Sequence, residues 1–319
     1  NLIFTMQLKN QQFQEDIMNK PLSLVTGAAG FIGSNLTDYL ITQGHQVICV
    51  DNKSADNEKF HWNDKAWNVD CDITDYQAMK NVFNKVDYVF HLAAESRLQP
   101  AIQNPINAVH KNCVGTATIL QCAREAGVKR FIYSSTSSGY GNNPYPNTED
   151  QPDDCLNPYS ASKVAGEKFC KMYYNLYGLE TVVLRYFNVF GLRSPTRGQY
   201  APVIGIFRRQ KEAGEPLTIV GDGSQKRDFV HVEDVARANY LASIMPLKRW
   251  GHDYTGDVFN VGSGKNYSIQ QIADAISDNQ VYISKRDGEM DTTLANISKI
   301  GSVIGWVPEI DVLDWINED

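Results

Sequence analysis

The chain has 319 residues, of which 42% are hydrophobic and 21% are charged, a composition typical of a globular protein large enough to bury a sizeable core. Its net charge of −7 argues against a nucleic-acid-binding surface. The sequence contains no apolar stretch of membrane-spanning length and no signal-peptide pattern, so neither membrane insertion nor secretion is expected. Its six cysteines form no C-x-x-C pair, which predicts reduced thiols, a cytoplasmic location and no metal site.

Residues 1–20 are rich in Gln and Asn and are interpreted as an N-terminal extension, with Met6 or Met18 as alternative native starts. Beyond them, short apolar runs alternate with longer segments of helical periodicity. This alternation predicts an α/β fold with a Rossmann-type, doubly wound parallel sheet over residues 21–187. The predicted strands cover residues 22–26, 46–51, 66–72, 88–93, 130–135 and 181–187, and the predicted helices cover residues 31–43, 76–84, 105–126 and 158–177.

The alternation breaks after residue 187. Residues 188–319 are predicted to form a smaller, mixed α/β lobe that binds the substrate and partly rejoins the first sheet. The expected elements of this lobe are helices over 202–213, 231–244 and 268–277 and strands over 217–220 and 257–261. Ligands of such folds usually bind in one cleft at the carboxyl edge of the sheet.

Gly27, Gly30 and Gly33 follow the first predicted strand and open the first predicted helix, with Phe31 and Ile32 between them. In a dinucleotide-binding loop the first glycine permits a tight turn, the second lets backbone N–H groups approach a pyrophosphate, and the third allows close packing of helix on strand. A plain glycine turn is the alternative. The placement between a strand and a helix favours the dinucleotide site.

Asp51 ends the second predicted strand and is followed by Asn52. An acidic side chain at this position accepts hydrogen bonds from the adenosine ribose and repels a 2′-phosphate. NAD is therefore favoured over NADP, although the neighbouring Lys53 leaves that choice open.

Three further strand ends carry candidate residues. Asp72 and Ile73 close the third strand, where contact with adenine and a plain strand-end cap are both consistent with the pattern. His91-Leu-Ala-Ala94 ends the fourth strand with small residues, which suit a backbone lying against a cofactor. Five consecutive hydroxyl residues, 134–138, end the fifth strand where a substrate hydroxyl would be oriented; a solvated loop is the alternative.

Tyr159 and Lys163 lie at positions i and i+4 of a predicted helix that begins at Asn157-Pro158. At this spacing the phenol and the ammonium share one helix face. The lysine is expected to lower the tyrosine pKa from about 10 toward neutrality and so to make Tyr159 a general base. A surface pair is the alternative, which the glycine loop upstream disfavours.

Taken together, these motifs resemble those of the extended short-chain dehydrogenase/reductase family, in its nucleotide-sugar epimerase branch. The resemblance runs from about residue 22 to residue 309. The segments that carry it are Gly27-Ala-Ala-Gly-Phe-Ile-Gly33, His91-Leu-Ala-Ala94, Asn112, Ser134-Ser-Thr136, Tyr159-Ser-Ala-Ser-Lys163, Leu184-Arg-Tyr-Phe-Asn188 and Gly221-Asp-Gly-Ser-Gln-Lys-Arg227-Asp-Phe-Val-His-Val-Glu-Asp-Val235.

The resemblance implies NAD as cofactor, a UDP-sugar as substrate, and a catalytic set of Thr136, Tyr159 and Lys163. The cofactor-binding residues it implies are Gly27, Gly30, Phe31, Ile32, Gly33, Asp51, Asn52, Asp72, Ile73, Leu92, Ala93, Ala94, Asn112, Ser134, Tyr159, Lys163 and Tyr186. The substrate-binding residues it implies are Thr136, Asn188, Val203, Thr218, Arg227, Arg286 and Thr293. The two arginines also suit phosphate oxygens on chemical grounds, because guanidinium groups bind them bidentately.

Thr136 is followed by Ser137-Ser138, where similar dehydratases and decarboxylases carry a carboxylate that assists elimination. Inversion at C4 needs only reversible oxidation, so the sequence favours a UDP-hexose 4-epimerase. The alternatives are a uronic acid epimerase, a reductase that consumes its cofactor, and a non-catalytic NAD-binding protein.

Two finer expectations follow from the resemblance. Thr293 corresponds to a gatekeeper position, where a small residue leaves room for a 2-acetamido group, so UDP-GlcNAc and UDP-GalNAc are candidate substrates beside UDP-glucose and UDP-galactose. The helices over 105–126 and 158–177 carry excess apolar residues, and relatives pair such helices in a homodimer. A monomer is the alternative.

Overall fold

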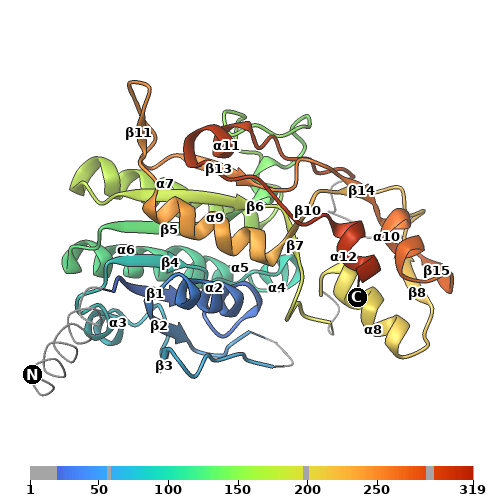
Figure 1. Ribbon diagram of the computed structural model, residues 1–319, viewed down its shortest axis with the longest axis horizontal. Coiled ribbons are helices and arrows are strands. Elements are labelled where there is room, and N and C mark those ends of the chain that lie inside the picture. Colours follow the sequence, from blue (N-terminus) through green and yellow to red (C-terminus); the bar gives the residue numbers. More distant parts are fainter. Residues whose placement is uncertain (1–19, 56–58, 197–200, 285–290, 319) are drawn as a thin grey trace, which may run out of the picture.

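Seven parallel strands form the central sheet of the computed structural model, which describes residues 20–55, 59–196, 201–284 and 291–318. Their order is β13-β6-β5-β4-β1-β2-β3 (Figure 1). Between β4 and β5 the register places His91 opposite Tyr133. The strands are β1 (Leu22–Thr26), β2 (Gln46–Asp51), β3 (Trp67–Asp70), β4 (Tyr88–His91), β5 (Arg130–Thr136), β6 (Thr181–Tyr186) and β13 (Val258–Val261).

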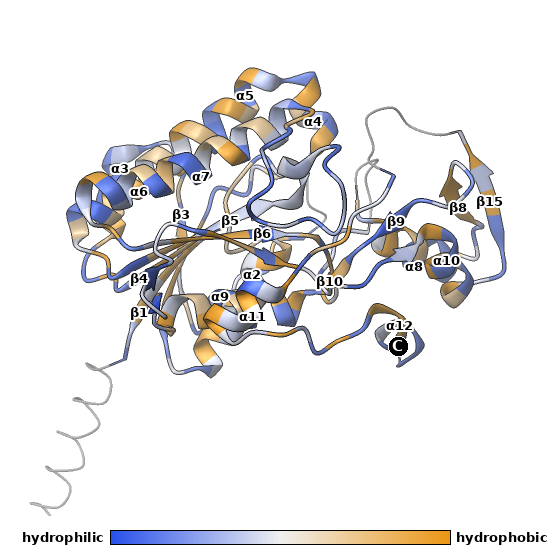
Figure 2. Cartoon of the chain, turned by 90° about the horizontal axis from the view of Figure 1, so that it is seen from above, coloured by the Kyte–Doolittle hydropathy of each residue, from blue (hydrophilic) through white to orange (hydrophobic). Residues whose placement is uncertain are grey.

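Helices cover both faces of the sheet (Figure 2). One face packs against α2 (Phe31–Thr42), α9 (Val232–Ile244) and α11 (Ser298–Ile304), and the other against α3 (Tyr76–Val82), α6 (Gly115–Ala126) and α7 (Pro158–Tyr177). Each face buries its own apolar core because strands covered on both sides are apolar on both sides. The prediction of a doubly wound parallel sheet is confirmed.

The C-terminal part of the chain adds short, mostly two-stranded ladders and three helices around a third apolar cluster. β13, in contrast, lies in the main sheet beside β6. The predicted assignment of the substrate to residues 188–319 stays a prediction. The elements are β7 (Asn188–Phe190) with β10 (Phe229–His231), β8 (Leu217–Val220) with β15 (Gln280–Ile283), β9 (Lys226–Arg227) with β14 (Tyr267–Ser268), the projecting hairpin β11 (Lys248–Arg249) and β12 (His252–Asp253), and the helices α8 (Val203–Glu212), α10 (Ile269–Ile276) and α12 (Val312–Glu318).

The predicted strand over 88–93 is too long, since β4 ends at His91. The N–H groups of Leu92 and Ala93 bond to the Thr26 hydroxyl instead of extending the ladder to β5. The predicted helix over 105–126 is also not uniform. It consists of α5 (Pro105–Val109), a π-helical turn η1 (His110–Val114) and α6, and a further helix, α4 (Leu98–Gln103), precedes it.

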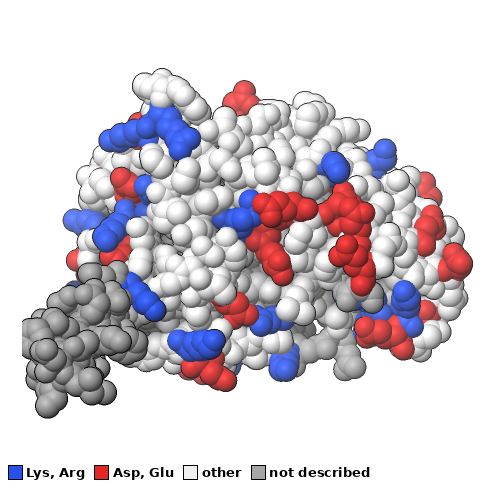
Figure 3. All heavy atoms as spheres, in the orientation of Figure 1, with Lys and Arg blue, Asp and Glu red and all other residues white. Residues whose placement is uncertain are grey.

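The surface carries charges of both signs. On the face drawn in Figure 3, Lys and Arg side chains are interspersed with Asp and Glu side chains. Within the described ranges, no helix is both long and apolar enough to cross a membrane.

Candidate active site

The junction of β1 and α2 has a geometry that only glycine satisfies at two positions, one in the loop and one in the first turn of α2. Gly27 has a φ of +69°, and a Cβ there would lie 2.8 Å from the backbone nitrogen of Ala93. A Cβ at Gly33 would lie 2.1 Å from the carbonyl oxygen of Gly27. The loop therefore lies tightly against both α2 and the end of β4, and the amino end of α2 faces the adjoining cavity, as a pyrophosphate site requires.

Asp51 supports this loop from the end of β2. Its carboxylate accepts hydrogen bonds from the N–H groups of Ala29 (3.1 Å) and Lys53 (2.7 Å). Burial raises the pKa of Asp51, and these two N–H groups oppose that rise. The Lys53 ammonium forms an ion pair with Asp70, so it is engaged by a carboxylate of the protein itself.

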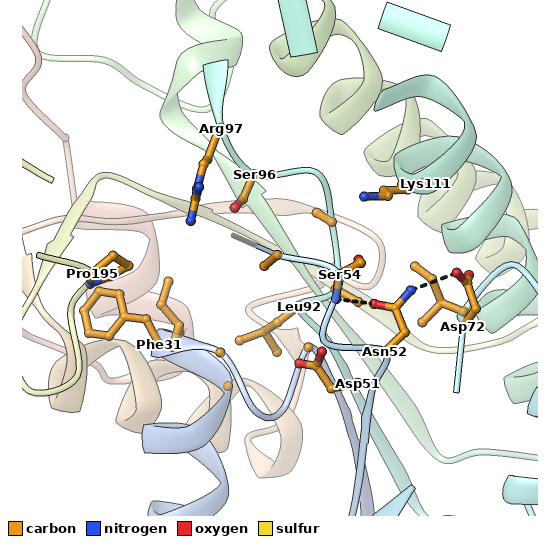
Figure 4. A pocket seen from close by; sticks show the side chains of 18 of the residues that line it. Phe31, Asp51, Asn52, Ser54, Asp72, Leu92, Ser96, Arg97, Lys111 and Pro195 are labelled. Carbon is orange, nitrogen blue, oxygen red and sulfur yellow. Dashed lines mark hydrogen bonds between the residues drawn. The ribbon is translucent and has the colours of Figure 1, made fainter. Parts of the chain in front are cut away.

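A cavity of about 270 Å³ opens beside the glycine loop. In Figure 4, Asp51 and Asn52 lie on one side of it, and Ser96, Arg97 and Lys111 lie on the other. The Asn52 amide donates to Asp72 at 2.8 Å and so joins two strand ends. Twelve of the predicted cofactor residues line this cavity: Gly27, Gly30, Phe31, Ile32, Gly33, Asp51, Asn52, Asp72, Ile73, Leu92, Ala93 and Ala94.

Sequence reasoning missed several residues of this wall, including Ser96, Arg97 and Lys111. Lys111 reaches the cavity from the π-helical turn η1, whose geometry a regular helical period does not reveal. Its ammonium lies 3.6 Å from the Glu95 carboxylate.

A second cavity of about 430 Å³ adjoins the first. Ser96 and Pro202 line both. Predicted residues that line the second cavity are Thr136, Tyr159, Tyr186, Asn188, Val203, Thr218 and Arg227. Ser137 and Ser138, from the predicted run of hydroxyl residues, also line it. Residues that were not predicted but line it include Leu156, Phe187, Ile206, Phe207, Val220, Gln225, Phe229 and Ile269.

Thr136 and Tyr159 meet in the wall of this second cavity. Thr136 lies at the end of β5, and its hydroxyl donates to Ser138 Oγ at 3.1 Å. Tyr159 lies in the first turn of α7, which Asn157 caps. Burial raises the pKa of Tyr159, and a hydrogen bond with Thr136 opposes the rise. A phenol and a hydroxyl thus face the same space from two different elements.

Lys163 is buried one turn further along α7. Burial lowers the pKa of Lys163 to about 8. The prediction that Lys163 lowers the Tyr159 pKa toward neutrality is wrong for the chain on its own, because burial dominates and the opposing partner is Thr136. The Lys163 ammonium lies over the Tyr133 ring, 4.4 Å from its centroid.

Three predicted cofactor residues, Asn112, Ser134 and Lys163, are not part of either wall. The Asn112 amide donates to the Glu95 carbonyl and to Ser162 Oγ, and so joins the segment after β4 to α7. Ser134 and Tyr186 hydrogen-bond to each other at 2.8 Å. Asn112 and Ser134 therefore support the cavity walls from behind.

The substrate residues predicted closer to the C-terminus do not all line the second cavity. Thr293 is 3% exposed and lies outside the wall, where its hydroxyl accepts a hydrogen bond from the Asn188 amide at 3.2 Å. Arg227 donates to the side-chain oxygen of Gln225 at 3.2 Å. Arg286 lies outside the described residues. Among the residues that are described, no group of His, Cys, Asp and Glu side chains could hold a metal ion.

A glycine loop after β1, an acid at the end of β2, and a tyrosine–lysine helix beside an adjoining cavity define a dinucleotide-dependent site of the oxidoreductase type. Residues 23–262 match the model of the NAD dependent epimerase/dehydratase family, and the chain belongs to this family. Its cofactor is therefore NAD, and the glycine loop and Asp51 fit that group.

Three known proteins show the range of this similarity. The UDP-glucuronate 4-epimerase of Thermodesulfobacterium geofontis is 34% identical over 91% of this chain and 92% of its own. The structure of the UDP-glucose 4-epimerase of Thermotoga maritima with UDP-glucose has a TM-score of 0.86 at 33% identity, covering 93% of this chain and 96% of that one. The structure of the UDP-N-acetylglucosamine 4-epimerase of Methanobrevibacter ruminantium with UDP-N-acetylmuramic acid has a TM-score of 0.86 at 32% identity, covering 94% and 96%.

Proposed function

We propose that this protein is an NAD-dependent UDP-sugar epimerase that inverts C4 of a UDP-hexose through a transient 4-keto sugar. The observation that carries the proposal is the shared wall of the second cavity, where Thr136 and Tyr159 face the same space beside the cofactor cavity. The three relatives, all named as UDP-sugar 4-epimerases, support it.

The wall of the second cavity favours epimerisation over elimination. The described residues that line it include no Asp or Glu, and Ser137 and Ser138 occupy the positions after Thr136. Loss of water from the sugar needs an additional acid and base. Inversion at C4 needs one proton acceptor and a reversible hydride acceptor, roles that Tyr159 and bound NAD would fill.

In the proposed reaction the Tyr159 phenolate accepts the proton of the sugar 4-hydroxyl, while the Thr136 hydroxyl hydrogen-bonds to the same oxygen. The glycine loop and Asp51 would hold NAD in the first cavity, where it would supply a reversible hydride acceptor. After the 4-keto sugar has turned, Tyr159 returns the proton to its C4 oxygen, and reduction of C4 on the opposite face would give the inverted hydroxyl. The charged Lys163 side chain favours the phenolate form once it lies near the phenol.

Inversion requires that the nucleotide stays bound while the hexose turns. Arg227 and Arg286 are proposed to hold the diphosphate. Asn188, Val203 and Thr218 are proposed to contact the same substrate. Much of the remaining wall is apolar and offers few fixed hydrogen bonds to a sugar. Strong attachment at the phosphates and weak attachment at the sugar suit this motion.

The sugar itself does not follow from similarity, because relatives named for glucuronate, glucose and N-acetylglucosamine are 34%, 33% and 32% identical. UDP-glucose and UDP-galactose remain the first candidates, and the small Thr293 supports UDP-GlcNAc and UDP-GalNAc as well. Thr293 would act on the sugar through Asn188, since it lies behind that residue.

The test is to incubate the purified protein with UDP-glucose, UDP-GlcNAc or UDP-glucuronate without added NAD, and to resolve the C4 epimers. We expect one or more pairs to interconvert. Stoichiometric consumption of reduced cofactor with a keto sugar would instead identify a reductase, and NAD binding without any turnover would identify a non-catalytic protein.

We also propose a homodimer and a cytoplasmic location. Exposed apolar side chains lie along α5, η1 and α7, among them Ile106, Val114 and Leu176 with 82%, 45% and 65% exposure. All six cysteines are free, which agrees with a reducing compartment. Light scattering measures the mass in solution, and a monomer at micromolar concentration would contradict the dimer.

A further inference from the structure

Tyr133 lies directly beneath the Lys163 side chain. The lysine nitrogen is 4.4 Å from the centroid of the Tyr133 ring, and the Tyr133 hydroxyl donates to the Lys163 carbonyl at 3.1 Å. Tyr133 is 0% exposed and Lys163 is 4% exposed. One residue of β5 thus contacts both the charged end and the backbone of Lys163.

Gly166 makes this approach possible. A Cβ at Gly166 would lie 2.2 Å from the Tyr133 hydroxyl oxygen. A side chain at this position would push α7 away from β5. The close contact between Lys163 and Tyr133 therefore depends on the absence of a side chain at Gly166 as well as on the two side chains themselves.

Tyr133, Lys163 and the neighbouring His91 form one buried cluster. His91 is uncharged, so Lys163 is the cation of these three residues. The His91 ring stacks on Tyr133 with centroids 5.9 Å apart. Its two nitrogens are hydrogen-bonded to Thr26 Oγ1 (2.7 Å) and Thr116 Oγ1 (3.0 Å). Complete burial lowers the pKa of His91 to about 3, so the imidazole is neutral at neutral pH.

In the described part of the chain, no carboxylate forms an ion pair with Lys163. Glu167, one turn along α7, accepts hydrogen bonds from Arg185 at 2.8 and 2.7 Å and from Ser135. The titratable groups whose charges act on Lys163 are Glu167 and Cys170 on α7 and Cys113 on η1, and Lys163 in turn acts on His91 of β4. The nearest stabilising surface for the ammonium is the π face of Tyr133.

We propose that Tyr133 is a positioning residue, whose ring face keeps the buried Lys163 side chain charged and fixes the position of its ammonium over that ring. The consequence for catalysis rests on the proposed function, in which Lys163 supports the Tyr159 phenolate. The ring would act before the cofactor and substrate bind, because it belongs to the apolar core.

The test compares rings of equal shape and different charge distribution at position 133. Tyr133→Phe keeps the π face, whereas incorporation of 3,4,5-trifluorophenylalanine at the same position weakens it with little change in packing. Lys163 is titrated by NMR in protein labelled with [ε-13C]lysine, and its signal is identified by its loss in Lys163→Met. We expect Tyr133→Phe to leave the midpoint unchanged and the fluorinated ring to lower it by about one pH unit, tenfold in the protonation equilibrium.

A matched control is trifluorophenylalanine at Phe131, which lies on the same strand and also packs against His91, with ring centroids 5.8 Å apart. It should not move the Lys163 titration. An unchanged midpoint with the fluorinated ring at position 133 would overturn the proposal, as would an equal shift from position 131.

Turnover provides the second measurement. The fluorinated ring at position 133 should move the alkaline limb of the pH–rate profile to lower pH by the same amount. If no UDP-sugar is converted, the proposed function fails while the NMR titration still decides the role of Tyr133. If turnover is normal and the titration does not move, the function stands and the role of Tyr133 falls.

Discussion

The two cavities of the site are built in different ways. The cofactor cavity is lined mainly by the segments at the carboxyl ends of strands β1 to β4. Each of these segments has a short sequence motif of its own. The second cavity collects one to three residues each from β5, α7, β7, α8, β8, β10 and α10, which are far apart in sequence. A parallel sheet brings its own strand ends together, whereas the second wall depends on how the C-terminal elements pack.

Tyr159→Phe tests the proposed base in the wall of the second cavity. Loss of the phenolic oxygen should lower kcat by about 100- to 10,000-fold and leave NAD binding unchanged, because Tyr159 contributes a proton acceptor and not the cofactor loop. Turnover and NAD content of the purified variant are measured. Tyr173→Phe removes a phenol from the same helix and should be nearly neutral. A near-wild-type rate for Tyr159→Phe would show that the base is wrongly assigned.

Gly33→Ala should damage the cofactor cavity alone. The added Cβ would lie 2.1 Å from the Gly27 carbonyl oxygen. We expect a loss of stability of about 1–3 kcal/mol and at least a tenfold weaker affinity for NAD. Thermal unfolding and NAD titration measure both. Gly301→Ala on α11 is the control, since its nearest non-local atom is 3.6 Å away and alanine favours the helix. Equal effects of the two variants would contradict the close packing.

The difference between the cavities explains how much could be predicted. Gly27, Asp51 and the residues after β4 were found because a turn, an acid or small side chains at a strand end have a local pattern. Lys111 was missed because a π-helical turn places it, and β9 was missed because a two-residue strand has no period. The roles of Val203 and Thr218 came from resemblance, since their own segments carry no chemical pattern.

Lys163→Met separates stability from catalysis. The Lys163 pKa of about 8 lies below the ordinary lysine value, so charging this buried amine costs folding free energy, about 3 kcal/mol at neutral pH. This cost is fully present below pH 8 and disappears as the pH rises toward the unfolded-state pKa. The variant should therefore be more stable at pH 7, with an advantage that shrinks above pH 8, and should lose turnover. Denaturant unfolding across this range measures the effect. Lys168→Met, an exposed lysine of the same helix, should show no such trend.

Arg227→Met should affect the second cavity and leave the first intact. Loss of a guanidinium that holds a diphosphate oxygen should raise KM for the UDP-sugar by about 10- to 100-fold. NAD affinity should stay the same. Steady-state kinetics and NAD titration give the two values. Arg249→Met, on the projecting hairpin, is the control for loss of a positive charge. A change in NAD affinity would show that the cavities are not separate in function.

Thr293→Val should give the smallest effect and decides how this buried residue acts on the sugar. Valine keeps the shape of threonine but removes the oxygen that accepts hydrogen bonds from the Asn188 amide and the Asp228 N–H. Loss of this acceptor is worth about 1 kcal/mol, or about fivefold in kcat/KM. If Thr293 only positions Asn188, the loss should be equal for UDP-glucose and UDP-GlcNAc, and Thr293→Ser should restore the rate. A gate for the acetamido group predicts instead that Thr293→Tyr reduces the N-acetyl rate selectively, so the ratio of the two substrates separates the two roles.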